Sequence, residues 1–343
     1  MVRRMSAENP VRTAVLGAGS FGTCLAILLA ERGFEVDLWS RDPHVAEAIE
    51  KHRRNPRYLT DFVLPKNVHA TASLTRVLAD KELIVSVVPS HAVREVWNQA
   101  QSLMREDALV VSASKGIEVG TGKLCSEVLM EILPARMHDR LCFLSGPSFA
   151  REIAERRPTA VALAANNENY AIAAQSLISS PLFRCYTNSD VMGVELGGAL
   201  KNVIAIAVGV ADGMESGLNS RAALITRGLA EMTRLGVAMG ANPVTFLGLA
   251  GVGDLVLTCT GDLSRNRRVG LEIGRGKPIQ EVLGGLTQVA EGVRTAKSAY
   301  ELAQKLGVDM PITTGVYLML YEGKNPFEAA VELRSRQLKS ETE

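Results

Sequence analysis

The six residues GAGSFG at positions 17–22 constrain this chain more than any other feature. They follow an apolar, β-branched segment, Val11–Leu16, and directly precede a helical segment. In this setting the pattern G-x-G-x-x-G predicts a dinucleotide site. Gly17 permits a tight turn, Gly19 lets the backbone approach a pyrophosphate, and Gly22 lets the helix pack close to the strand. The helix N-terminus then presents its amides to the phosphates. The alternative is a plain strand-to-helix turn.

Length and charge restrict the class of protein. A chain of 343 residues predicts two domains, and 47% hydrophobic residues suffice for their cores. Because 38 basic side chains balance 37 acidic ones, we expect no nucleic-acid partner. The longest apolar run, Val203–Ala211, is far shorter than the ~20 residues of a membrane span, so we expect no integral membrane segment. Five scattered cysteines without C-x-x-C spacing indicate free thiols and a cytoplasmic location.

The first half of the chain alternates strand and helix signals, whereas the second half is rich in helix formers. Repeated β-α units predict a mainly parallel, doubly wound α/β sheet domain of the Rossmann type, followed by an all-α domain. We expect a leader at residues 1–10, a dinucleotide-binding domain at 11–189 and a helical substrate domain at 190–343. The strand candidates are Thr13–Leu16, Glu35–Trp39, Leu83–Val87, Ala108–Ser112, Leu141–Leu144, Ala160–Ala164 and Phe183–Tyr186. The helix candidates include Phe21–Arg32, Pro43–Arg53, Ala92–Leu103, Leu124–Leu133, Tyr170–Ser179, Val191–Asp212, Ser220–Met239, Gly292–Leu306 and Pro311–Glu322.

The end of the second predicted strand bears on the choice of dinucleotide. In this type of domain an acidic residue about 20 positions past the glycines holds the ribose 2′-hydroxyl of NAD. Here Arg41 occupies that region, and an arginine can pair with the 2′-phosphate of NADP. The neighbouring Asp42 could instead turn towards the ribose. We therefore expect NADPH to be accepted at least as well as NADH.

The chain lacks the usual patterns of metal and serine-hydrolase sites. Its five histidines are dispersed, and the pattern G-x-S-x-G does not occur. We therefore expect no metal, and we infer hydride chemistry, in which the nicotinamide carries out the difficult step.

Three segments offer groups for that chemistry. Lys115 follows a predicted strand at the carboxyl edge of the sheet, where ligands bind; the alternative is a surface lysine. Lys201 interrupts a very apolar helix, so it is either buried for a purpose or extends to the surface. Asp254 follows a Gly-x-Gly turn and could orient Lys201. Such a contact would raise the lysine pKa and burial would lower it, so the net direction stays open. Residues 264–266 offer a hydroxyl, a guanidinium and an amide that suit a phosphate or a carboxylate; the alternative is a helix N-cap.

At these residues the chain closely resembles the NAD(P)-dependent glycerol-3-phosphate dehydrogenases of bacteria, from Val15 to about Tyr321. The resemblance implies reduction of dihydroxyacetone phosphate to sn-glycerol 3-phosphate, the backbone of phospholipids. The matching segments are residues 17–22, 114–116 (SKG), 145–150 (SGPSFA), 195–202 (ELGGALKN), 251–255 (GVGDL), 264–266 (SRN) and 291–292 (EG).

The resemblance also implies roles for individual residues. Lys201 would be the proton donor and acceptor, assisted by Lys115 and Asp254. The remaining roles are divided between cofactor and substrate. Cofactor contacts fall on Gly17, Gly19, Ser20, Phe21, Gly22, Arg41, Lys115, Ala150, Arg265, Val289 and Glu291. Substrate contacts fall on Lys115, Gly146, Ser148, Lys201, Asp254, Ser264, Arg265 and Asn266.

Two other functions remain open. A related β-hydroxyacid dehydrogenase would also combine a Rossmann domain with a helical domain, but its substrate would carry a carboxylate rather than a phosphate. A regulator that senses NAD(P) without turnover would not need Lys115, Lys201 and Asp254 together. For either enzyme, the apolar faces expected on the helical domain make a homodimer plausible.

Overall fold

The first half of the chain forms a single twisted sheet. The structure, a computed structural model, describes residues 11–285, 290–338 and 340–341, so the expected leader at 1–10 lies outside the described residues. The strand order is β3-β2-β1-β4-β5-β6-β7-β8. Every neighbouring pair is parallel except β6 and β7, which confirms the predicted mainly parallel sheet. The strands are β1 (Arg12–Leu16), β2 (Glu35–Trp39), β3 (Val68–Thr71), β4 (Leu83–Ser86), β5 (Leu109–Ser112), β6 (Leu141–Ser145), β7 (Thr159–Ala164) and β8 (Phe183–Asn188).

Helices cover both faces of this sheet, as a parallel sheet requires. In β1 the side chain of Val15 belongs to the hydrophobic cluster that includes α1, whereas Ala14 and Leu16 belong to the cluster that includes α4 and α5. The helices of this half are α1 (Ser20–Glu31), α2 (Pro43–His52), α3 (Leu74–Leu78), α4 (Val93–Ala100), α5 (Cys125–Ile132), α6 (Ala150–Ala154) and α7 (Glu168–Ile178), with a short 3₁₀ segment, η1 (Ser90–Ala92). The sequence did not predict β3, α3 or α6.

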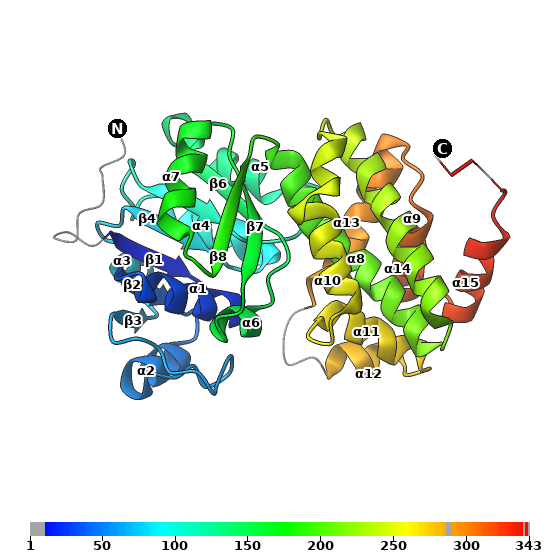
Figure 1. The fold of residues 1–343 in the computed structure, drawn as a ribbon, viewed down its shortest axis with the longest axis horizontal. Helices are drawn as coiled ribbons and strands as arrows, with labels where there is room; N and C mark the ends of the chain where they lie inside the picture. The colour runs from blue at the N-terminus through cyan, green and yellow to red at the C-terminus, as the bar shows by residue number, and fades with distance from the viewer. Residues whose placement is uncertain (1–10, 286–289, 339, 342–343) are drawn as a thin grey trace.

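The second half is helical, as predicted, and no strand follows β8 in the part of the chain that the structure describes. Figure 1 shows the two halves side by side, with α15 far from the sheet. The elements are α8 (Val191–Gly213), α9 (Gly217–Ala238), η3 (Pro243–Leu247), the π-helical turn η4 (Leu249–Gly253), α10 (Asp254–Thr260), α11 (Arg265–Gly274), α12 (Ile279–Gly284), α13 (Glu291–Leu306), α14 (Pro311–Glu322) and α15 (Pro326–Ser335).

Helix α8 is the centre of the helical half. It packs against α9, α10, α11, α13 and α14. By length and composition alone α8 could cross a membrane, but 94% of its most apolar window is buried inside the protein, which is typical of a core helix. A Cβ at Gly209 would overlap the carbonyl oxygen of Arg267, and one at Gly270 would overlap that of Ile206. These two glycines therefore allow α8 and α11 to touch along their backbones, which brings the start of α11 to the middle of α8.

Candidate active site

The glycine-rich turn has the shape that a dinucleotide requires. Gly17 has φ +112°, and a Cβ there would lie 3.0 Å from the carbonyl oxygen of Val87. A Cβ at Gly22 would overlap the carbonyl oxygen of Gly17, so the turn can pack only with glycine at both positions. A Cβ at Gly19 would meet nothing within 4 Å, and Gly19 supplies no side-chain cap to α1, which begins at Ser20. The helix N-terminus therefore faces open space, and the residues present fit a pyrophosphate.

The end of β2 presents an arginine. Arg41 is exposed, two residues after the strand ends. The carboxylate of Asp42 is occupied: one oxygen accepts a hydrogen bond from the amide of His44 at 3.0 Å, and the other pairs with Arg57 at 2.6 Å. Asp42 therefore caps α2 instead of turning towards a ribose, and Arg41 is left as the accessible charge at this edge.

Two lysines from different halves of the chain share one buried carboxylate. Lys115, in the loop after β5, donates to Asp254 Oδ2 at 2.8 Å and to the carbonyl oxygen of Gly146 at 3.2 Å. Lys201, in the middle of α8, donates to Asp254 Oδ1 and to Thr258 Oγ1, the latter at 2.9 Å. Asp254 is fully buried at the start of α10. The two ammonium groups and one carboxylate carry a net charge of +1, which suits a site where negative charge develops on an oxygen.

The protonation states follow from this arrangement. Burial lowers the pKa of Lys201 to about 8, although the Asp254 carboxylate opposes the shift. Burial alone would raise the pKa of Asp254, but Lys115 and Lys201 outweigh it and hold that pKa below its usual value. Lys201 thus loses its proton more easily than an ordinary lysine while its partner stays ionised, which suits a group that must both give and take a proton.

The loop after β6 also reaches these lysines. The carbonyl oxygen of Gly146 accepts from Lys115 and, at 2.8 Å, from the hydroxyl of Ser148. Ala150 follows as the first residue of α6. The predicted residues 146, 148 and 150 therefore lie on a short segment that leads from Lys115 to a helix N-terminus.

Residues 264–266 form hydrogen bonds within the helical half. Ser264 Oγ accepts from the amide of Arg267 at 3.2 Å and caps α11, a role foreseen as the alternative. The amide group of Asn266 donates to Asn202 Oδ1 at 2.9 Å, and its oxygen accepts from the amide of Gly292 at 3.0 Å. Asn266 therefore joins α8, α11 and α13 beside Lys201.

Two predicted cofactor residues, Arg265 and Glu291, are the first residues of α11 and α13. Arg265 is exposed to solvent, and its positive charge interacts with the carboxylate of Glu291. The carboxylate of Glu291, at the start of α13, accepts two hydrogen bonds from Ser90 in the sheet half. The predicted residue Val289 lies outside the described residues.

Sequence reasoning missed two residues that the structure brings to this site. Thr258 lies one helical turn after Asp254 on α10, so the spacing D-x-x-x-T was a usable signal. Ser90 follows β4 at the same sheet edge as the loop after β5, and that position was a second signal.

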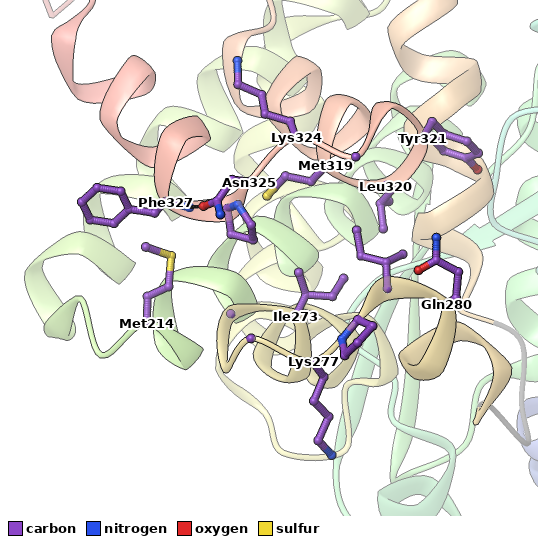
Figure 2. A pocket seen from close by; sticks show the side chains of 16 residues that line it. Met214, Ile273, Lys277, Gln280, Met319, Leu320, Tyr321, Lys324, Asn325 and Phe327 are labelled. Atoms are coloured by element: carbon purple, nitrogen blue, oxygen red, sulfur yellow. Dashed lines mark hydrogen bonds between the residues drawn. The ribbon is translucent and has the colours of Figure 1, made fainter.

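A cavity elsewhere in the helical half is not part of this site. It has a volume of about 720 Å³ and lies where α11 and α14 end, between Met214, Ile273, Met319 and Phe327 (Figure 2). None of the predicted site residues lines it. Over the described residues, histidine, cysteine and carboxylate side chains form no group of three or more able to hold a metal ion.

Comparison with known families gives matches over nearly all of the chain. A family model described as the N-terminus of NAD-dependent glycerol-3-phosphate dehydrogenase matches residues 12–171, and the model of the C-terminus matches residues 190–331. A protein of Citrifermentans bemidjiense named glycerol-3-phosphate dehydrogenase (NAD(P)+) is 54% identical over 330 residues, which are 96% of this chain and 98% of the relative. One of the same name from Myxococcus xanthus is 51% identical over 331 residues, covering 96% and 99%.

Solved structures agree with these sequence matches. The crystal structure of glycerol-3-phosphate dehydrogenase from Coxiella burnetii superposes with a TM-score of 0.90 at 40% identity, covering 95% of this chain and 99% of that one. D-mandelate dehydrogenase shares the fold alone, with a TM-score of 0.61 at 13% identity over 93% of this chain and all of that one.

Proposed function

The chain belongs to the NAD-dependent glycerol-3-phosphate dehydrogenase family, and on this premise we propose that it reduces dihydroxyacetone phosphate to sn-glycerol 3-phosphate, reversibly, with NADPH or NADH. The reaction would supply glycerophospholipid synthesis. The observation that carries the proposal is the carboxylate of Asp254, held between Lys115 and Lys201 where the sheet half meets the helical half. We also propose that the boundary between the two domains lies near residue 189.

Lys201 is the proposed proton donor. A bound nicotinamide supplies the hydride for reduction. Lys201 then gives its proton to the substrate oxygen that becomes a hydroxyl, and in the oxidation it takes that proton back. Asp254 and Thr258 accept two of the three ammonium hydrogens, which leaves one for the substrate. Lys115 adds a second positive charge beside the same oxygen.

The other predicted residues divide between the two ligands. Ser20, Phe21 and the three glycines would hold the pyrophosphate, Arg41 a 2′-phosphate, and Ala150, Val289 and Glu291 further parts of the dinucleotide. Gly146 and Ser148 would contact the substrate, and Arg265 would pair with its phosphate beside Ser264 and Asn266. The guanidinium of Arg265 supports this assignment, because its planar fork of donors matches phosphate oxygens. The capping role of Ser264 uses its oxygen as acceptor and leaves its hydroxyl hydrogen available to a ligand.

The protein is proposed to act as a cytoplasmic homodimer. All five cysteines are free and buried, which supports a reducing compartment. Large apolar side chains are exposed on the helical half, notably Leu218, Val244, Leu247 and Phe327, and this supports association of two copies.

The direct test is the fall of absorbance at 340 nm when dihydroxyacetone phosphate is added to the enzyme with NADPH. We expect Lys201→Ala to lower kcat by ~10²–10⁴-fold, the usual effect of losing a positioned acid. Lys297→Ala, on the exposed face of α13, serves as the control and should leave kcat unchanged. Turnover of 3-hydroxy acids instead would favour the β-hydroxyacid dehydrogenase. Cofactor binding without any turnover would favour the regulator.

A further inference from the structure

The segment that follows β4, residues 87–90, contacts the glycine-rich turn, the Lys115 loop and the helical half. The carbonyl oxygen of Val87 lies against Gly17 of the glycine-rich turn. The carbonyl oxygen of Val88 accepts a hydrogen bond from Ser114 Oγ at 2.7 Å, in the loop that carries Lys115. Ser90, the last residue of the segment, reaches the helical half. A short stretch of backbone thus connects the expected cofactor turn, one catalytic lysine and the second domain.

Ser90 makes two hydrogen bonds across the domain boundary. Its hydroxyl donates to Glu291 Oε2 at 2.6 Å, and its amide donates to Glu291 Oε1 at 3.2 Å. Ser90 is itself buried. Both oxygens of the carboxylate are therefore held by one residue, and hydrogen bonds to an ionised acceptor are about twice as strong as neutral ones.

Ser90 also fills the space beside the Lys115 loop. Gly116 has φ +156°, and a Cβ there would lie 2.5 Å from Ser90 Oγ and 2.6 Å from Ser90 Cβ. The loop therefore packs directly on the serine side chain. Any movement of Ser90 changes the position of the residue next to Lys115.

From Glu291 the contacts continue to the second catalytic lysine. The amide of the next residue, Gly292, donates to the side-chain oxygen of Asn266, and the Asn266 amide group donates to Asn202. Asn202 is the neighbour of Lys201 on α8. An unbroken series of packed and hydrogen-bonded residues thus runs from the Lys115 loop through Ser90 to Lys201.

We propose that Ser90 is a positioning residue that sets the placement of Lys115 relative to Lys201 by anchoring Glu291 across the domain boundary. Glu291 then acts as the helical half's attachment point to the sheet half, besides any contact with the cofactor. This inference rests on the proposed function, because it assumes that the two lysines act on one substrate.

The test compares Ser90→Ala with the wild-type enzyme. We expect kcat/KM for dihydroxyacetone phosphate to fall about 10- to 100-fold, mainly through kcat, because small displacements of catalytic groups have effects of this size. The dissociation constant of NADPH and the Tm should change little. Ser179→Ala is the matched control: it also loses one hydrogen bond, from the amide of Cys185 in the edge strand β8, and should keep wild-type kinetics.

A double-mutant cycle identifies the contact. In a Glu291→Ala background the Ser90→Ala change should have no further effect on kcat/KM, because the bond is already broken. If the double variant instead shows the product of the two separate decreases in kcat/KM, the proposal is wrong. If Ser90→Ala does not fold, Ser90→Cys replaces it: a thiol is a weaker donor to the Glu291 carboxylate, so an anchoring role predicts a fall in kcat/KM in the same direction. A cysteine variant with wild-type kcat/KM would contradict the anchor.

Amide hydrogen exchange separates this inference from the proposed function. Residues 113–118 should exchange about 10-fold faster in Ser90→Ala, whatever the substrate is. Unchanged exchange in that segment overturns the anchor even if the enzyme is active. Absence of turnover in the wild-type enzyme, with faster exchange in the variant, would overturn the proposed substrate and leave the anchor supported.

Discussion

At the scale of single residues, the chemistry of the site depends on how firmly Lys201 holds its proton. Burial lowers the pKa of Lys201 to about 8 in spite of its contact with Asp254. Reduction requires the ammonium form, so kcat/KM for the ketone should be flat at low pH and fall about tenfold per pH unit above the pKa. Oxidation requires the neutral amine, so its kcat/KM should rise towards the same pKa. Steady-state kinetics in both directions between pH 6 and 10 would measure this.

A variant of Thr258 tests whether Lys201 is the group that titrates in these pH profiles. Its hydroxyl accepts a hydrogen bond from the Lys201 ammonium and so stabilises the charged form. Thr258→Val should move the midpoint of both profiles to lower pH. Thr260→Val is the control, because the Thr260 hydroxyl is exposed and donates to the carbonyl oxygen of Val256 on the same helix. A midpoint that does not move in Thr258→Val would argue against Lys201 as the titrating group.

Arg41 is expected to determine which dinucleotide binds better. Because the carboxylate of Asp42 is already bound to His44 and Arg57, it does not oppose a 2′-phosphate as a free acid would. Charge-assisted hydrogen bonds contribute ~1.5–3 kcal/mol, so Arg41→Ser should lower the NADPH/NADH ratio of kcat/KM roughly 10- to 100-fold. Arg76→Ser, exposed on α3, should leave the ratio unchanged. An unaltered ratio in Arg41→Ser would refute the assignment.

At the scale of elements, local signals predicted two helices that begin at a proline and the strands that are strongly apolar. Pro43 opens α2 and Pro311 opens α14, as their fixed φ favours. Strand β3 was missed because its four residues, VHAT, show neither a long apolar run nor a clear alternation.

The turn before Asp254 shows why part of the site could not be predicted. The sequence GVG was interpreted as a Gly-x-Gly turn, whereas Leu249–Gly253 forms a π-helical turn that continues into α10. A Cβ at Gly251 would overlap the carbonyl group of Phe246, so tertiary packing selects this conformation. Its position after GVG identified Asp254 as a candidate partner of Lys201, but only the packed structure reveals that Lys115 binds the same carboxylate.

Glu231, on α9, stabilises the N-terminus of another helix, α14. Its carboxylate accepts from the amides of Ile312 at 2.6 Å and Thr313 at 3.1 Å, at the N-terminus of α14. Glu231→Gln replaces one acceptor by a donor facing Thr313 and should lower the free energy of unfolding by about 1–3 kcal/mol. Burial raises the pKa of Glu231 to about 7, so the wild-type protein loses stability as the pH rises from about 4.5 towards 7.

Urea unfolding of both proteins at pH 5 and pH 8 tests this. The difference between wild type and Glu231→Gln should be smaller at pH 8, because the variant has no ionising group at this position. A difference that is equal at both pH values would mean that Glu231 ionises in the folded protein as it does in the unfolded chain.

At the scale of the whole molecule, the site exists only where the two halves meet. The sequence contained the residues of the site but not all of their partners, because segments as distant as 115 and 254 come together where α8 and η4 pack on the sheet. Besides Glu291 and Asp254, a third carboxylate crosses this boundary. Glu195, on α8, accepts from the amide of Ser126 at 3.1 Å, in the first turn of α5. The helix that carries Lys201 is thereby attached to the sheet half about 1.7 turns before the lysine.

The protonation of Glu195 gives the last prediction. Burial raises its pKa to about 8, so at pH 7 the neutral acid predominates and Glu195→Gln resembles it in shape and charge. We expect Glu195→Gln to lie within about 0.5 kcal/mol of wild type near pH 4, where the carboxyl is protonated in both states, and to be the more stable protein at pH 7, where the unfolded wild-type chain is ionised. Glu195→Ala should be about 2 kcal/mol less stable than Glu195→Gln, since the Ser126 amide then has no acceptor. The measurement is urea unfolding at pH 4, pH 7 and pH 9.

The sign of the pH effect distinguishes this explanation from a simple packing role. A raised pKa means that wild-type stability falls as the pH rises towards 8, because the folded protein must then bury a carboxylate. The glutamine variant carries no such charge, so relative to wild type it should gain stability between pH 7 and pH 9. If Glu195→Gln instead loses stability over that interval, the ionised carboxylate is the form that joins α8 to α5.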